Sequence, residues 1–557
     1  MKLVAKIIAG TFVLALLTGA SATNSKPTER QRALHALNRL AFGPRPGDVD
    51  AIAKSGVDAW IERQLHPEAI PDRAVEARVN LLPTMTMSNA QIVKTYYEPV
   101  LMARKKAKAE AKDGEVDQKE IRRELMRDIP ADQRPQIVMN NLLSQRIIRA
   151  AESDRQLNEV MVDFWMNHFN VFAGKGIDRF LLTSYERDVI RPHIWGHFED
   201  LLMATAKSPA MLFYLDNARS TAAPENRPRF AQRAAFGNGR FGGRAMPDAM
   251  QRAQRKGGLN ENYAREIMEL HTLGVDAGYT QKDVTELARV LTGWTITRER
   301  DGGGEGAAFV FRPFLHDSGA KSVMGTRFAA GGGIEEGERV IHMLAHHPAT
   351  AHRIAFKLCQ RLVADEPPPA LVDRVAAKFL ASDGDLRLTV KAVIASPEFW
   401  DPAVYRAKVK SPFEYTISAV RAVNGTIADA TPIARALQQI GEPLYGAQPP
   451  TGYSDKADVW INTGALMNRL NFALSLASNK LPGVHGDVVS LINAGDATDV
   501  SRSVEALALA LTGGNLTEET RATIKSRIAE VKTPMENNAQ LPTVAGLILG
   551  SPEFQRQ

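Results

Sequence analysis

The chain is nearly free of cysteine, and this scarcity limits how its fold can be stabilised. Cys359 is the only cysteine among 557 residues, so an intramolecular disulfide is excluded. A chain of this length can bury a large core and is expected to hold two or three subdomains. An exported protein of this size without disulfides must rely on its core, which suits a bacterial periplasm or exterior.

Long apolar runs and several familiar catalytic motifs are also missing. After residue 22 no stretch approaches 18 uninterrupted apolar residues, so we expect no transmembrane segment in the mature chain. The absence of a nucleophile elbow, a P-loop and a dinucleotide-binding motif disfavours acyl-serine, nucleoside-triphosphate and nicotinamide chemistry. No nucleic-acid recognition motif is present either, and we expect no nucleic-acid partner.

Residues 1–22 have the pattern of a secretory signal peptide. Lys2 and Lys6 precede an apolar run, and an A-x-A cleavage site ends at Ala22. The apolar run is too short to span a membrane. We therefore expect cleavage after Ala22 and a soluble mature protein in the bacterial periplasm or outside the cell.

Helical periodicity dominates the mature chain, and the composition is that of a soluble globular protein, with 44% apolar and 24% charged residues. We predict a mainly α, multi-helical fold with a small β-hairpin insertion around residues 307–325, where Phe309 and Phe311 alternate with other residues. The predicted regions are an N-terminal helical region (23–216), a flexible basic loop (217–258), a central helical core with the β insertion (259–403) and a C-terminal helical region (404–557).

The loop 217–258 carries more positive charge than the whole chain. It has nine Arg or Lys against Glu225 and Asp248, whereas the net charge of the protein is +6. Its glycine and arginine content offers little apolar surface to offset the entropy of ordering, so we expect it to be mobile. An anionic polymer or surface is one candidate partner for this loop. A solubilising insertion explains the same composition.

The stretch 259–295 holds the densest set of chemically capable side chains and predicts two helices. Asn260 suits the N-cap of the first helix, and Thr280 with Asp283 forms a capping-box-like start for the second. Gly274 and Gly293 are expected to end the two helices.

Three polar residues of the first helix, Asn262, Glu266 and Glu269, lie at positions i, i+4 and i+7 and so share one face. Two carboxylates and an amide in one line could do acid–base work, with Glu266 as the best general base. Arg265, however, is four residues from Glu269, which is also how an ordinary solvated helix face is paired.

The stretch 157–172 repeats this spacing with Asp163, Asn167 and Asn170, and His168 lies beside them. The rest of the stretch is apolar almost all round, so the helix should be buried and its polar groups need partners. We expect this row to face the row of Asn262, Glu266 and Glu269 across a cleft. Hydrogen bonds within the core of a helical bundle are the alternative explanation.

Further candidates come from the β insertion and from a histidine-rich helix. His316, Asp317 and Lys321 lie close together on a loop framed by glycines, which suits a functional site and also suits the end of a strand. His342 and His346 have the i, i+4 spacing of metal ligands, but no Glu-x-x-His or HExxH context accompanies them. A divalent metal is therefore a candidate cofactor of unknown location.

The predicted site combines these groups around one cleft. Its catalytic candidates are Glu266, Glu269, His168, Asp163, His316 and Asp317, and its substrate-binding candidates are Asn167, Asn170, Asn262, Arg265, His271, Lys321 and Trp294.

Several stretches together carry a family resemblance: RLAFGPRPGDV near residue 40, FWMNHFNVF, ENYAREIMELHTLGVDAGYTQKDVTELARVLTGWT and IASPEFW. They resemble the bacterial, mostly exported family catalogued as domain of unknown function 1800, over nearly the whole mature chain. The resemblance implies a mainly helical fold and genetic neighbours similar to exported sulfatases and alkaline phosphatases. It supplies no catalytic residue.

Two functions remain open from the sequence. The first is an exported, hydrolase-like enzyme that acts on an extracellular or cell-envelope substrate through a carboxylate and histidine cleft. The alternative is a non-catalytic periplasmic scaffold or chaperone-like partner of a neighbouring exported sulfatase-like protein. In that case the basic loop 217–258 and the aromatic segment 441–460 would be its contact surfaces.

Overall fold

The computed structural model describes residues 27–110, 123, 127, 129–228, 240–241, 244–245, 258–275, 277–297, 306–493, 495–530 and 540–557. The predicted signal peptide and most of the basic loop lie outside these ranges. The start of that loop, residues 217–228, is anchored, because Asn217 Nδ2 donates to the carbonyl oxygens of Leu291 at 3.2 Å and Trp294 at 3.1 Å. The packed structure thus extends beyond residue 216, where the flexible loop was predicted to begin.

The fold is mainly helical, which confirms the predicted class. Before the basic loop lie α2 (Glu29–Leu40), α3 (Asp48–Ser55), α4 (Val57–Leu65), α5 (Arg73–Asn80), α6 (Asn89–Ile92), α7 (Glu98–Glu110), α9 (Gln136–Glu152), α10 (Gln156–His168), α11 (Asp178–Ser184), α12 (Phe198–Ala206) and α13 (Pro209–Tyr214). After it come α16 (Glu261–Glu266), α17 (Gln281–Val290), α18 (Ile334–Ala345), α19 (Pro348–Leu362), α20 (Pro369–Ala381) and α21 (Leu386–Ile394). The C-terminal helices are α22 (Pro412–Ala422), α23 (Thr431–Ile440), α24 (Thr463–Ala477), α25 (Val500–Thr512), α26 (Glu518–Glu530) and α27 (Leu541–Leu549).

Wider π-helical turns continue three of these helices: η3 (Val93–Tyr97), η5 (Tyr185–Ile190) and η8 (Ile267–Thr272). The caps predicted for the stretch 259–295 are present. The Asn260 side chain accepts from the Asn262 N–H, and Thr280 and Asp283 form a reciprocal capping box. Gly274 and Gly293 take left-handed backbone angles just past the ends of the two helices, with φ of 95° and 83°.

Strands are few and short. In the described ranges they form two-stranded antiparallel pairs: β1 (Arg240–Phe241) with β2 (Arg244–Ala245), β3 (Trp294–Ile296) with β4 (Phe309–Phe311), β5 (Lys321–Val323) with β6 (Thr326–Phe328), and β7 (Thr426–Ile427) with β8 (Val484–His485). The predicted β insertion is therefore two small sheets, because β4 pairs back to β3 and β5 pairs forward to β6.

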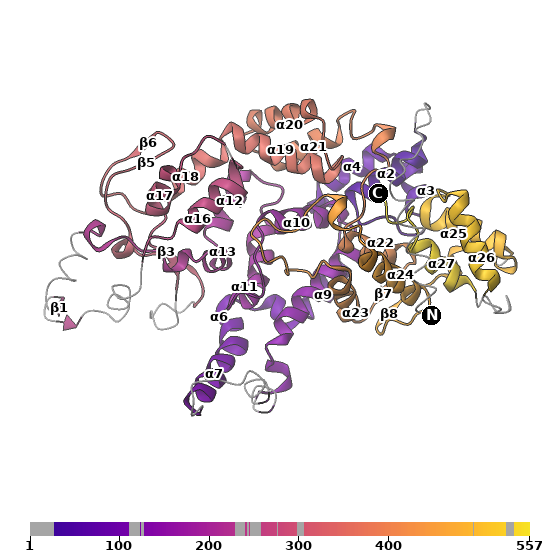
Figure 1. The fold of residues 1–557 in the computed structure, drawn as a ribbon, viewed down its shortest axis with the longest axis horizontal. Helices are drawn as coiled ribbons and strands as arrows, with labels where there is room; N and C mark the ends of the chain where they lie inside the picture. Colours follow the sequence, from indigo (N-terminus) through magenta and orange to yellow (C-terminus); the bar gives the residue numbers. More distant parts are fainter. Residues whose placement is uncertain are drawn as a thin grey trace.

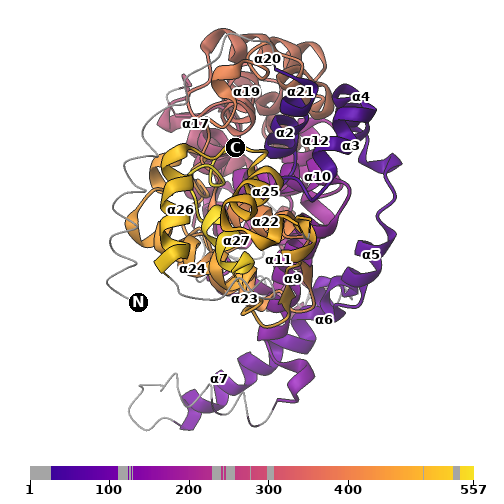
Figure 2. The same ribbon diagram turned by 90° about the vertical axis from the view of Figure 1, so that its right-hand side faces the viewer.

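The molecule is elongated, with the α16–α18 region at one end and the C-terminal helices α22–α27 at the other (Figure 1). Helices α6 and α7 project from the body as an arm (Figure 2). Two apolar cores lie within the body. One joins α2, α4, α10, α12 and α16–α21, and the other joins α22–α27 with residues of α9. None of the helices in the described ranges has the length and apolar character that a membrane crossing requires.

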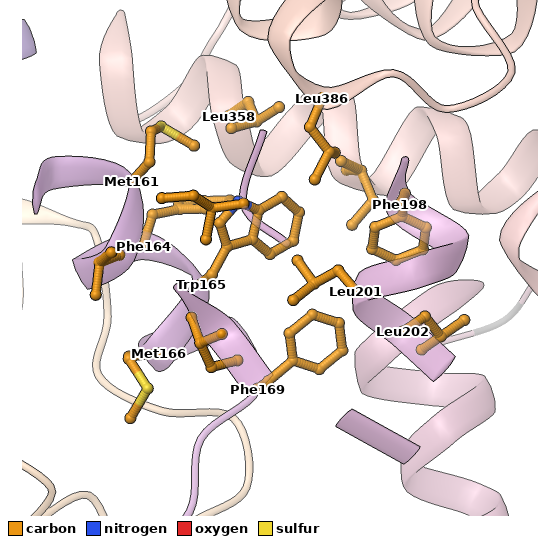
Figure 3. Packing of buried hydrophobic residues seen from close by; sticks show 14 of the residues in the cluster. Met161, Phe164, Trp165, Met166, Phe169, Phe198, Leu201, Leu202, Leu358 and Leu386 are labelled. Carbon is orange, nitrogen blue, oxygen red and sulfur yellow. The ribbon is translucent and has the colours of Figure 1, made fainter. Parts of the chain in front are cut away.

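Helix α10 lies at the centre of the larger core. Trp165 is fully buried and packs among Phe198 and Leu201 of α12, Leu358 of α19 and Leu386 of α21 (Figure 3). Burying a side chain of this size is worth about 1.5–3 kcal/mol, so this contact fixes which face of α10 points inward. Asp163 and Asn167 of α10 lie away from this face and are half-buried, whereas His168 packs against Trp165.

Trp294 was predicted to contact substrate, but the structure buries it completely. Its ring packs edge-on against Phe309 with centroids 5.4 Å apart and lies against Gly337 of α18. A Cβ added at Gly337 would lie 2.8 Å from the indole Cε2 atom. Trp294 is therefore a core residue that joins β3 to α18, and it has no surface to offer a ligand.

Replacing Gly337 by alanine tests this packing. Alanine favours a helix over glycine by about 1 kcal/mol, but overpacking a rigid core costs about 1–3 kcal/mol. We expect Gly337→Ala to lower the free energy of unfolding, measured by urea denaturation. The control Gly464→Ala in α24, where the nearest atom is 3.5 Å away, should be neutral or stabilising. A Gly337→Ala protein as stable as wild type would contradict the close approach of α18 to Trp294.

Candidate functional site

A polar pocket lies where the two cores meet, between α9, α10, α19, α22 and the 441–460 segment. Its cavity volume is about 50 Å³, which holds about three to five waters. The charged groups that line it are Arg146, Asp163, Arg361, Lys408, Glu414, Glu442 and Asp455, and the polar or aromatic groups include Asn167, Asn170, Tyr445, Tyr453 and Trp460. Junctions between packed units are common places for ligand sites.

Asp163 of α10 bridges two arginines in the wall of the pocket. Arg146 Nη2 donates to Asp163 Oδ1 at 2.8 Å, and Arg361 Nη2 donates to Asp163 Oδ2 at 2.9 Å. Arg361 also pairs with Glu414 of α22 at 3.0 Å, and Arg146 pairs with the buried Glu186 at 3.3 Å. Both oxygens of Asp163 are thus occupied, so it holds helices together and is poorly placed to act as a catalytic base.

Glu414 is kept ionised by its neighbours. Burial raises the pKa of this carboxyl, but the Arg361 guanidinium and a hydrogen bond from the Gln557 side chain outweigh burial and hold the pKa below its ordinary value. The amide Nε2 of Gln557 lies 3.0 Å from Glu414 Oε1.

Glu442, just after the end of α23, has the opposite environment. Burial raises its pKa to about 8, and the negative charge of Asp163 adds to the rise. The Phe413 N–H donates to Glu442 Oε2 at 2.8 Å, which opposes the rise without cancelling it. Glu442 is therefore protonated at neutral pH while the nearby Glu414 is ionised. Carboxyl groups whose pKa values are driven apart in one cleft are typical of acid–base sites.

The 441–460 segment forms the outer wall and is fastened to the end of α10. Asn167 Nδ2 donates to the Tyr453 carbonyl at 2.8 Å, and the Tyr453 N–H donates to Asn167 Oδ1 at 2.7 Å. Asn170 Nδ2 donates to the carbonyls of Ala447 and Pro449 at 3.0 and 2.9 Å. The two asparagines predicted to bind substrate therefore position this wall.

The prediction that the α10 row faces the row on the stretch 259–295 is wrong. The described hydrogen bonds of Asn167 and Asn170 lead to the 441–460 segment, and those of Asp163 lead to arginines. Two local features explain the error. Helix α10 ends at His168, so Asn170 leaves the helical line, and the π turn η8 carries Glu269 away from α-helical spacing.

Glu266 and Glu269 lie outside the residues that line the pocket, and both are half-buried. Burial raises the pKa of Glu266, and the neighbouring charge of Glu269 raises it further. Tyr279 Oη donates to Glu269 Oε2 at 3.4 Å. On the same helix Asn262 is exposed, and Arg265 donates to the Gln281 side chain at 2.6 Å.

His168 and His271 lie behind the pocket, buried in the larger core. Their ring centroids are 6.3 Å apart, and His168 Nε2 lies 3.2 Å from the His271 carbonyl oxygen. Burial lowers the pKa of both rings, that of His271 to about 3, and the cations Arg353 and Lys357 lower both further. Both imidazoles are neutral at physiological pH, so neither can serve as a charged acid there.

His316, Asp317 and Lys321 form a separate structural network, away from His168. Asp317 pairs with Arg289 of α17 through two bonds of 3.0 and 2.9 Å. His316 Nε2 and Lys321 Nζ lie 3.2 and 2.7 Å from Glu336 Oε2 on α18. These buried pairs hold the small sheets against α17 and α18. This structural role accounts for the presence of His316, Asp317 and Lys321 without a catalytic role.

Sequence reasoning missed most of the charged groups in the pocket: Arg146, Arg361, Lys408, Glu414, Glu442 and Asp455. A weak signal existed in α19, where Arg353, Lys357 and Arg361 repeat every four residues and share one face. No comparable signal marked Glu442, because only the folded chain brings it beside Asp163.

The protonation of Glu442 predicts a pH dependence of stability. The folded carboxyl keeps its proton up to about pH 8, whereas the unfolded one releases it near 4.5. Between these values the folded state binds more protons, so wild-type stability should fall as pH rises, by at most about 1.4 kcal/mol per unit. Glu442→Gln mimics the neutral carboxyl and should remove this slope. The measurement is the free energy of unfolding of the two proteins, from urea denaturation between pH 5 and 8. An equal change with pH in both proteins would contradict a raised pKa of Glu442.

Comparison with known proteins places the chain in one family. A family model described as Protein of unknown function (DUF1800) matches residues 35–556. No curated protein and no solved structure matches the chain. The match runs from within α2 to residue 556 and so includes every element that builds the pocket. The protein is therefore a member of the DUF1800 family.

Proposed function

We propose that this protein is an exported hydrolase that cleaves a glycosidic bond in an extracellular or cell-envelope glycan, with Glu442 as the acid. The observation that carries the proposal is a neutral carboxyl, with its pKa raised to about 8, in a polar cavity beside ionised carboxylates. Glycoside hydrolysis needs this combination: a protonated carboxyl for the leaving oxygen and an ionised carboxylate that activates water or attacks the sugar.

Asp455 is the best partner for Glu442. Its carboxylate makes one ion pair among the described residues, to Arg361 at 3.6 Å, whereas Asp163 and Glu414 have each oxygen in a shorter contact. Burial raises the pKa of Asp455, and the charge of Arg361 opposes this rise. A carboxylate with a raised pKa and free acceptor capacity suits a general base.

Tyr453 offers a partly exposed aromatic ring at the pocket for a sugar, and the buried Trp460 packs beside it. Tyr453 and Trp460 lie with ring centroids 6.0 Å apart and a tilt of 56°, and both line the pocket. Aromatic rings that expose an apolar face beside polar groups bind amphipathic ligands well. The cavity has room for only a few waters, so a glycan would lie at the mouth of the pocket beside Tyr453.

Export to the periplasm or beyond supports an envelope substrate, and it rests on the signal-peptide pattern of residues 1–22. An exported protein similar to sulfatases or alkaline phosphatases is a proposed functional partner, because such an enzyme would remove substituents from the same polymer. The basic residues of 217–258 would attract an anionic polymer.

The non-catalytic alternative has one observation in its favour. Asn167, Asn170 and Arg361 use their hydrogen-bonding groups to hold the 441–460 segment and α22 in place. A rigid segment of this kind would also serve a scaffold that binds a partner protein.

Activity measurements on isolated cell-envelope glycans separate the two functions. Wild type should release reducing ends, and Glu442→Gln and Asp455→Asn should each lower the rate by about 10²–10⁴-fold. The rate should decline as pH rises through about 8, because Glu442 then loses its proton. Glu398→Gln, a carboxylate paired with Arg374 away from the pocket, is the matched control.

A Glu266→Gln variant tests the location of the acid. Full activity is expected, because Glu266 does not line the pocket. Loss of activity in Glu266→Gln together with retention in Glu442→Gln would move the acid to Glu266 at the end of α16 and refute the assignment of Glu442. Absence of any glycan cleavage by wild type would favour the scaffold.

A further inference from the structure

A group of potential metal ligands lies on the surface between α12 and α18, and none of its residues lines the polar pocket. Within the described ranges, Glu199, His342 and His346 are the one group whose three nitrogen or oxygen ligand atoms all lie within 4.8 Å of one another. Glu199 is in the first turn of α12, His342 is in the last turn of α18, and His346 is its C-cap.

We infer that Glu199, His342 and His346 form a zinc site. Glu199 Oε2 lies 2.9 Å from His342 Nδ1 and 3.7 Å from His346 Nδ1. Ligand atoms at about 2.1 Å from a tetrahedral zinc are about 3.4 Å apart, so the two distances lie on either side of the required value. Two imidazoles and one carboxylate are a donor set that zinc accepts, whereas magnesium and calcium prefer oxygen alone.

The surroundings already orient one of the histidines. Asp383, in the turn between α20 and α21, accepts from His346 Nε2 at 2.8 Å. A carboxylate on the far nitrogen is the usual way to fix a ligating imidazole and leave the other nitrogen for the metal. His346 Nδ1 also lies 2.9 Å from the His342 carbonyl oxygen. Zinc binding at Nδ1 would break this hydrogen bond and release its proton to the solvent.

The same arrangement defines what the metal would do. Three protein ligands leave one coordination position free, and because the His342 side chain is 59% exposed, water can fill that position. Glu199, the histidine pair and Asp383 come from three separate parts of the chain, so a bound zinc would fasten α12 to the end of α18 and, through Asp383, to the α20–α21 turn. The site is independent of the proposed hydrolase chemistry, since it shares no residue with that pocket.

The sequence indicated two of the three ligands of this site. The i, i+4 spacing of His342 and His346 was visible, but the third ligand lies 143 residues before His342. Only the packing of α12 against α18 brings Glu199 to the histidine pair.

The test is zinc titration of the full-length mature protein after removal of metals with a chelator. Isothermal titration calorimetry should give one zinc per chain, and zinc should raise the melting temperature because it binds the folded state. Glu199→Gln and His342→Ala should remove saturable binding. Asp383→Asn should weaken binding about 10–100-fold, as loss of a group that orients a ligand does. Magnesium should have no effect.

His352→Ala is the matched control, because His352 is a surface histidine on α19 that pairs with Asp373 at 3.6 Å. It should bind zinc like wild type. Circular dichroism confirms that each variant is folded before titration. A wild-type protein that binds no zinc, or Glu199→Gln and His342→Ala proteins that bind it with unchanged affinity, would overturn the site. Because the measurement is metal binding, its outcome does not depend on glycan cleavage.

Discussion

One carboxylate shared by two guanidinium groups holds the centre of this molecule together. Asp163 sits between Arg146 of α9 and Arg361 of α19, and Arg361 continues the chain of charges to Glu414 of α22. Taking such charges out of water costs several kcal/mol per ion, and only close pairing offsets it. Each of these ions needs a partner where the two apolar cores meet. The pairing therefore fixes the geometry of this junction between the cores.

The chemistry of the pocket follows from where this pairing ends. Arg361 and hydrogen bonds to the carboxylate keep Glu414 ionised. Burial and the nearby negative charge of Asp163 keep Glu442 protonated. The same burial that makes the paired ions necessary thus raises the pKa of Glu442, which has no ion pair among the described residues of the pocket. The junction between the two cores therefore contains a carboxylic acid, Glu442, that is protonated at neutral pH. This acid is the basis of the proposed hydrolysis.

Local features of the fold were predictable from the sequence, and contacts between distant segments were not. Caps depend on residues two or three apart, so Asn260 and Thr280 were identified correctly. The apolar character of α10 predicted its burial, and its polar residues did require partners. The choice of partner failed, because the end of α10 at His168 and the π turn of η8 are set by tertiary packing.

Two further errors have the same cause. His316 and Asp317 were assigned to a site because of their residue types, but Glu336 and Arg289, from other helices, make them structural. Glu442 carried no sequence signal, because its pKa depends on burial and on Asp163, which lies far from it in sequence. Residue type and spacing therefore identified only some of the polar groups, and the roles of these groups depended on neighbours that the sequence does not bring together.

A double-mutant cycle on Asp163 and Arg361 tests the central claim most directly. The free energies of unfolding of wild type, Asp163→Asn, Arg361→Gln and the double variant give the coupling between the two side chains. Removing either partner leaves the other charge buried, so each single change should be strongly destabilising, and the coupling should reach about 0.5–3 kcal/mol. The half-exposed pair of Arg374 and Glu398 should show less, about 0.2–1 kcal/mol. Additive effects at Asp163 and Arg361 would contradict a structure organised around their ion pair.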